Sequence, residues 1–153
     1  MARYREQYDR MRRWYEKFRC LDQGRNHEIA SDNYVDDIYA FFQNAYHLKD
    51  WLRNDPSVAD SAKFRVETHI NMNKPLCLCA DICNSLKHLT LKQSRSDENP
   101  TFGRKAFSLS IGSGPTTLGL KHQIDTDSGP LDAFELATAC VKAWDDFFVS
   151  HSL

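Results

Sequence analysis

The chain has 153 residues, of which 41% are hydrophobic, and its 20 Lys and Arg against 21 Asp and Glu give a formal net charge of -1. This length predicts a single domain over residues 1–153 with enough apolar side chains for a core. The balanced charge removes the simplest argument for a dedicated nucleic-acid or membrane-surface protein, and no apolar run approaches the roughly 18 residues of a membrane span. The first residues contain no apolar leader, so we expect a soluble, cytoplasmic protein without a membrane partner.

Apolar residues recur at steps of three and four over residues 2–21, which predicts a first helix. The same periodicity predicts helices over 32–54, 56–71, 75–90 and 131–149. Pro56 and Pro75 suit the first turns of the third and fourth of these helices. The apolar stripe of the third helix consists of Val58, Ala62, Val66 and Ile70.

Between the fourth and fifth helices, apolar residues alternate with polar ones on both sides of Gly112-Ser113-Gly114-Pro115. This pattern predicts a β-hairpin over about 105–124, preceded by an exposed polar loop over 92–104. The fold class is therefore mainly α, an antiparallel bundle of about five helices with a β-hairpin inserted before the last helix. Because a lone hairpin is only marginally stable in water, it must lie on the bundle or pair with another chain, and it is a candidate interface.

The five cysteines are an odd number, and three of them, Cys77, Cys79 and Cys83, fall within seven residues. Their spacing lacks the two-residue gaps and matching second pair of a zinc site. They are typical of small buried hydrophobic residues in a helix, and we expect no metal and no cofactor.

Two predicted helices carry polar residues at the edge of the apolar stripe. The second helix has His47 and Asp50, and the fourth has a row at i, i+3 and i+7 with a flanking lysine, namely Asp81, Asn84 and His88 with Lys87. Buried polar groups need partners, so we expect the two rows to face each other. Asp and His together suit general acid–base catalysis, and the six residues are candidate catalytic residues. The same groups would equally form an inert hydrogen-bond network that fixes helix register.

The first helix is the one clearly basic element. We regard Arg5, Arg12, Arg13 and Arg19 as candidate nucleic-acid-binding residues, with a solvated face as the alternative. The remaining histidines are not expected to be catalytic or to bind a ligand; they are His27, His69, His122 and His151.

The bundle, with its polar, His-containing helix Asn84-Ser85-Leu86-Lys87-His88, resembles the HEPN superfamily of small helical bundles. That resemblance implies a dimer and either ribonuclease activity or partnership with a nucleotidyltransferase, and it carries over to Asn84 and His88. The catalytic motif of the family is an Arg and a His separated by four to six residues. Arg65 and His69 have three residues between them, so the motif is not matched.

Two functions follow as expectations. The first is a non-catalytic interaction protein that forms a homodimer or binds a protein partner through the hairpin and the first helix. The alternative is a HEPN-like protein that binds RNA or a nucleotide, or a metal-independent ribonuclease in a toxin–antitoxin or phage-defence setting, using the His/Asp/Asn/Lys cluster.

Overall fold

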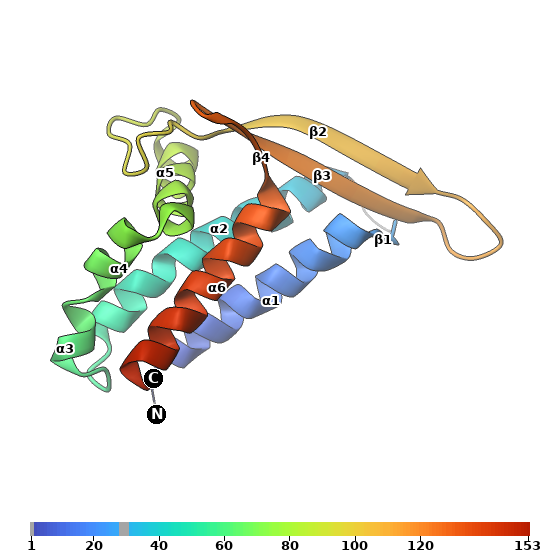
Figure 1. The fold of residues 1–153 in the computed structure, drawn as a ribbon. Helices are drawn as coiled ribbons and strands as arrows, with labels where there is room; N and C mark the ends of the chain where they lie inside the picture. The colour runs from blue at the N-terminus through green and yellow to red at the C-terminus, as the bar shows by residue number, and fades with distance from the viewer. Residues whose placement is uncertain (1, 28–30) are drawn as a thin grey trace.

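The computed structural model describes residues 2–27 and 31–153, and the protein is mainly helical. Three long helices lie side by side (Figure 1), and shorter segments connect the second of them to a fourth that packs on it. In chain order the helices are α1 (Tyr4–Gln23), α2 (Ser31–Asn54), α3 (Asp60–Lys63), α4 (Val66–Met72), α5 (Lys74–His88) and α6 (Ala133–His151). None of the helices in the described residues combines the length and apolarity that crossing a bilayer requires.

Aromatic side chains fill the space between the long helices. Phe18 of α1, Phe41 and Phe42 of α2 and Phe147 of α6 are all inaccessible or nearly so. The indole Nε1 of Trp144, also in α6, donates a hydrogen bond to the carbonyl of Ala45 at 3.0 Å, so this buried polar group is satisfied. The periodicity that predicted α1, α2, α5 and α6 thus corresponds to the faces that the helices bury.

The helix predicted over 56–71 is wrong as a single element, because the segment forms α3 and α4 with a turn at Phe64 and Arg65. Its apolar residues are spaced by four, and each such step advances about 40° around an α-helix of 3.6 residues per turn. A continuous helix would rotate Ile70 well away from Val58. The break corrects this rotation, and all four residues of the stripe are buried.

A small antiparallel sheet precedes α6. Its strands are β1 (Arg25–Asn26), β2 (Thr101–Ser110), β3 (Thr117–Thr126) and β4 (Gly129–Asp132). The predicted hairpin is β2–β3, but β3 also pairs on its other side with β1 and β4, so the hairpin is not alone. Residues 131 and 132 belong to β4 and not to the last helix, which begins where Asp132 accepts hydrogen bonds from the amides of Phe134 and Glu135.

The sheet lies across one end of the long helices, and the hairpin continues beyond them (Figure 1). The residues of β3 that face the helices are buried: Leu118, Leu120, His122 and Ile124. In β2, by contrast, every residue from Arg104 to Ser110 is exposed, and within the described residues this strand pairs only with β3. Its outer edge is therefore open along its length.

Candidate functional site

Asp81 is a completely buried carboxylate on α5 that fastens the following loop. Its Oδ1 accepts the amide of Arg95 at 2.7 Å. Its Oδ2 accepts the amide of Ser96 at 2.8 Å and the hydroxyls of Ser94 and Ser96 at 2.8 and 2.6 Å. With both oxygens accepting hydrogen bonds from the loop, Asp81 is a structural anchor and makes no hydrogen bond to the other predicted site residues.

Glu98, near the C-terminal end of the same loop, is a second carboxylate that holds it through hydrogen bonds. It accepts hydrogen bonds from Lys74 at the start of α5 at 2.6 Å, and from the amide and hydroxyl of Ser128 in the β3–β4 turn at 2.9 and 2.8 Å. The hydrogen bond from Lys74, followed by those from Ser128, lowers the pKa of Glu98 to about 2. Two buried carboxylates thus hold the second half of the segment 89–100, which has no helix or strand of its own.

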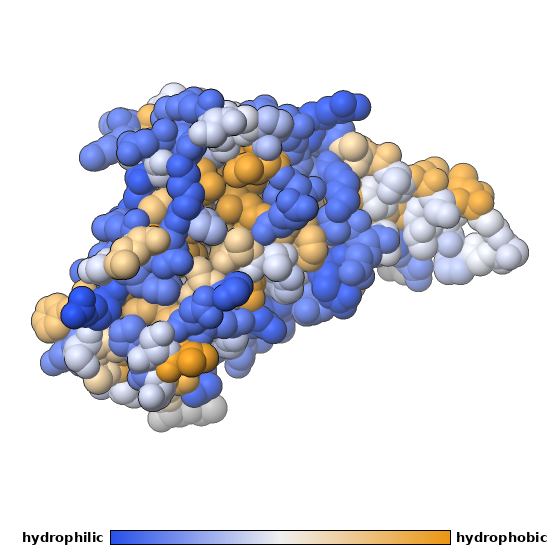
Figure 2. All heavy atoms as spheres, viewed as in Figure 1, coloured by the Kyte–Doolittle hydropathy of each residue, from blue (hydrophilic) through white to orange (hydrophobic). Residues whose placement is uncertain are grey.

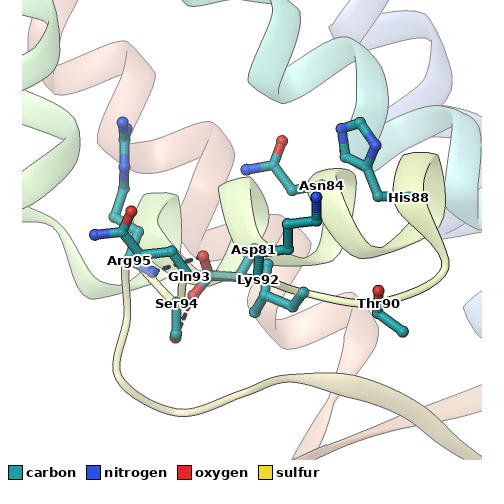
Figure 3. A pocket seen from close by; sticks show the side chains of 9 residues that line it. Asp81, Asn84, His88, Thr90, Lys92, Gln93, Ser94 and Arg95 are labelled. Carbon is teal, nitrogen blue, oxygen red and sulfur yellow. Dashed lines mark hydrogen bonds between the residues drawn. The ribbon is translucent and has the colours of Figure 1, made fainter.

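This loop and one face of α5 enclose a pocket of about 600 Å³, which we call the α5 pocket. Its lining comprises Asp81, Asn84, His88, Thr90, Leu91, Lys92, Gln93, Ser94 and Arg95. Figure 3 shows Asn84 and His88 projecting from the same face of α5, the ammonium of Lys92 directed toward the space between them, and Arg95 extending in another direction. The polar row predicted from the sequence therefore lines a pocket of the size that small-molecule sites have.

The guanidinium of Arg95 is directed toward an acidic residue of α4. Its Nη2 lies 3.1 Å from Glu67, which also contacts Lys49 at 3.4 Å and Arg53 at 3.0 Å. The Nη1 atom of Arg95 is buried without a partner. One carboxylate is thus shared by three cations from α2 and the loop, and it provides the only ion pair that Arg95 makes among the described residues.

The predicted residues of α2 lie outside the α5 pocket. His47 is exposed, and exposed Asp50 has only its neighbour Lys49 within ion-pair distance, at 3.5 Å. Among the described residues, no hydrogen bond joins His47 or Asp50 to the row on α5, and the partners of Asp81 come from the loop instead. The two helices do meet at Cys83, where burial raises the thiol pKa to about 12 and the charges of Lys87 and Asp50 also act.

The cysteines fit the expectation of small buried residues. Cys77, Cys79 and Cys83 are all buried, and no group of three or more candidate metal ligands occurs in residues 2–27 and 31–153.

The arginines of α1 are largely engaged with neighbouring side chains. Arg12 lies 3.4 Å from Asp145, and Arg19 lies 2.8 Å from Glu16. Arg5 stacks over the ring of Tyr4 at 5.6 Å, and Arg13 is exposed. These contacts favour the solvated-face alternative for this helix over a continuous phosphate-binding surface.

A second candidate surface is the outer half of the hairpin. Phe107, Leu109 and Ile111 are 47%, 56% and 75% exposed, and Figure 2 shows apolar side chains along the projecting hairpin. Phe107 pairs with Leu120 and Leu109 with Leu118, so these side chains continue the face of the sheet that covers the helices. Beyond the helices nothing within the described residues covers this face.

Sequence reasoning missed the loop residues of the α5 pocket, above all Lys92 and Arg95. They lay in a segment that was predicted only as an exposed polar loop, and no local pattern indicates that its backbone returns to Asp81. The chain matches no protein-family model, no curated protein and no solved structure, so the geometry alone supports a function.

Proposed function

We propose that the protein is an interaction protein that forms a homodimer through its β2–β3 hairpin. The observation that carries this proposal is the exposed apolar pair Phe107 and Leu109 on β2, continued by Ile111 directly after the strand, together with the unpaired outer edge of β2. An open strand edge is a template for pairing with another strand, and soluble proteins usually protect it with charges, prolines or bulges. Here the bulge lies between Phe102 and Lys105, close to the helices.

The outer part of the hairpin lacks these protective features. From Ala106 to Leu120 the sequence contains no charged residue, and its single proline, Pro115, lies in the turn. A partner for this edge must itself offer an uncharged strand edge and an apolar face. The same strand of a second copy offers both.

Charge favours a two-fold, antiparallel arrangement of the two copies. The cations of β2, Arg104 and Lys105, lie at the end nearest the helices. Antiparallel pairing places them opposite the uncharged outer end of the partner strand, whereas parallel pairing would bring like charges together. The apolar rows of the two copies then lie next to each other on one face of a continuous sheet.

The proposal is tested by measuring the mass of the full-length protein by sedimentation velocity over a range of concentrations. We expect a dimer for the wild type and a monomer for Leu109→Lys, because a charge on the apolar row would be buried in the interface. Ser110→Lys adds the same charge to the opposite face of the exposed strand and serves as the matched control, for which we expect a dimer. A wild type that remains monomeric up to millimolar concentration would refute the proposal.

A hydrogen-exchange measurement checks the mode of association. The outward-facing amides of β2 should exchange slowly only at concentrations at which the dimer forms. Fast exchange of these amides in a dimeric sample would place the interface elsewhere.

The alternative, a HEPN-like RNA- or nucleotide-binding protein or ribonuclease, is favoured by one observation: Asn84 and His88 line the same pocket as Lys92. A base would have to come from His88, because both oxygens of Asp81 are occupied. An RNA-cleavage assay of the wild type and His88→Ala decides this alternative. Equal cleavage by both proteins, or none by either, removes the ribonuclease.

A further inference from the structure

The unoccupied polar groups of the α5 pocket include several hydrogen-bond donors. Among the described residues, the ammonium of Lys92, the amide of Asn84 and the imidazole of His88 have neither a hydrogen bond nor an ion pair. The carboxylate of the lining, Asp81, has both oxygens occupied by the loop. The donors to Asp81 are neutral, so its charge stays in the lining, but the lining also holds two cations, Lys92 and Arg95. A ligand that enters this pocket therefore meets a net positive lining and the free donors of Lys92, Asn84 and His88, which favours an anion.

The acidic residue next to Arg95, Glu67, is already paired. Arg95 at the edge of the pocket and two cations of α2 share the single carboxylate Glu67, so that carboxylate has no capacity left for Lys92. The second half of the loop, from Ser94 to Glu98, is also held by the hydrogen bonds of Asp81 and Glu98, so binding does not have to order that part. A preformed site of this kind loses less conformational entropy on binding than a flexible loop would.

The number and origin of the donors indicate the kind of anion. Asn84 and His88 come from α5 and Lys92 comes from the loop, so they approach a common space from different sides (Figure 3). A phosphate group presents three terminal oxygens to such a set, whereas a carboxylate presents two. The volume of about 600 Å³ exceeds that needed by the ion alone.

A second groove with a mixed polar and apolar lining adjoins the pocket and offers room for the remainder of such a ligand. It shares His88, Thr90 and Leu91 with the α5 pocket and is also lined by the rings of Tyr39 and Phe102, which lie 4.6 Å apart. A ligand with a phosphate and a planar, apolar body could occupy both hollows. We propose that the α5 pocket binds the phosphate group of a small phosphate ester of nucleotide size, with Lys92, Asn84 and His88 as its ligands.

One residue of the second groove, Leu89, has an unusual backbone. Leu89 has φ of 64° and ψ of -35°, a conformation that a leucine rarely adopts, and its side chain is 92% exposed. Strained backbone and an uncovered apolar side chain in one residue are characteristic of a site that contacts a ligand. The body of the ester would cover Leu89 as it crosses from the pocket to the groove.

The experiment measures binding to the full-length protein by isothermal titration calorimetry. The probes are adenosine monophosphate, inorganic phosphate, adenosine and a short single-stranded RNA. We expect adenosine monophosphate to bind, and adenosine to bind at least about tenfold more weakly because it lacks the charged group. Lys92→Gln should weaken the binding of adenosine monophosphate by about tenfold or more, since one charge-assisted hydrogen bond is lost.

Lys142→Gln is the matched control, because it removes the same charge from an exposed position on α6. It should bind adenosine monophosphate as the wild type does. Equal weakening in both variants, or no binding of either adenosine monophosphate or inorganic phosphate by the wild type, would overturn the proposal. The proposal would also be overturned if Lys92→Gln were less stable but bound adenosine monophosphate normally. Lys92 would then only stabilise the negative C-terminal end of the α5 dipole.

The RNA probe distinguishes the source of the phosphate. Binding of RNA, lost in Lys92→Gln, together with binding of inorganic phosphate but not of the mononucleotide, supports the phosphate site and assigns it to a polymer. All three proteins retain the hairpin, so the mass of each in solution tests the proposed dimer separately.

Discussion

Replacing Asp81 by alanine should destabilise the protein strongly while leaving its helices intact. The substitution removes the acceptor of two backbone amides and two hydroxyls, of which the Ser96 groups are buried. A buried donor without a partner costs about 1–3 kcal/mol. The hydroxyls can rotate toward other acceptors and the loop can open to water. We therefore expect a loss of about 3 kcal/mol of unfolding free energy, well below the sum over four donors.

Urea unfolding followed by circular dichroism measures this loss, and limited proteolysis locates it. Asn84→Ala is the matched control, since Asn84 lies one turn further along the same face of α5 and makes no hydrogen bond with the described residues. It should change the unfolding free energy by less than about 0.5 kcal/mol. In Asp81→Ala, cleavage should appear first within residues 89–100. A loss below about 1 kcal/mol with a loop that still resists protease would refute the role of Asp81 as an anchor.

Three further predictions concern strained or buried groups. His122 is 2% exposed and neither ring nitrogen has a partner, so His122→Leu should raise the unfolding free energy by about 1 kcal/mol in a thermal melt or urea titration. Burial, followed by the charge of Lys105, lowers the pKa of His122 in the folded protein below its ordinary value of about 6.5. The unfolded chain therefore binds a proton more readily, so the wild type should lose stability as pH falls below about 6.5, and His122→Leu should lose less. Leu89→Gly should stabilise by about 0.5–1 kcal/mol despite removing a side chain, because glycine adopts positive φ without strain. The pKa of Glu98 is lowered to about 2, so its contribution should be complete above about pH 5 and lost as pH falls toward 2, and Glu98→Gln should flatten that part of the stability profile.

Local periodicity predicted the elements that bury one continuous face. The observed ranges are close to the predicted ones for α1, α2, α5 and α6. Apolar residues at helical spacing are buried together on one side only when the segment is a helix. β1 and β4 could not be predicted in the same way. They have two and four residues, and pairing with β3 stabilises them more than any pattern of their own.

The candidate site was likewise predicted only where a local sequence pattern marked it. The spacing of Asp81, Asn84 and His88 was visible in the sequence, and the three do line one pocket. Their partners were not visible, because they come from a loop whose path depends on a hydrogen bond from residue 95 back to residue 81. The burial of His122 was not predicted, although it lies on β3 between Leu120 and Ile124 and shares their buried face.

The α5 pocket and the outer hairpin lie at different parts of the molecule, so we expect ligand binding and dimerisation to be independent of each other. The α5 pocket is built from α5 and the loop, whereas Figure 1 shows the tip of the hairpin on the far side of the sheet from that loop. Any effect of the ligand on dimerisation must equal the effect of dimerisation on the ligand, because binding free energies are reciprocal. We therefore expect Leu109→Lys to bind adenosine monophosphate as the wild type does, and Lys92→Gln to dimerise as the wild type does. A change in either measurement would mean that the partner copy reaches the α5 pocket, and that the pocket and the dimer interface form a single site.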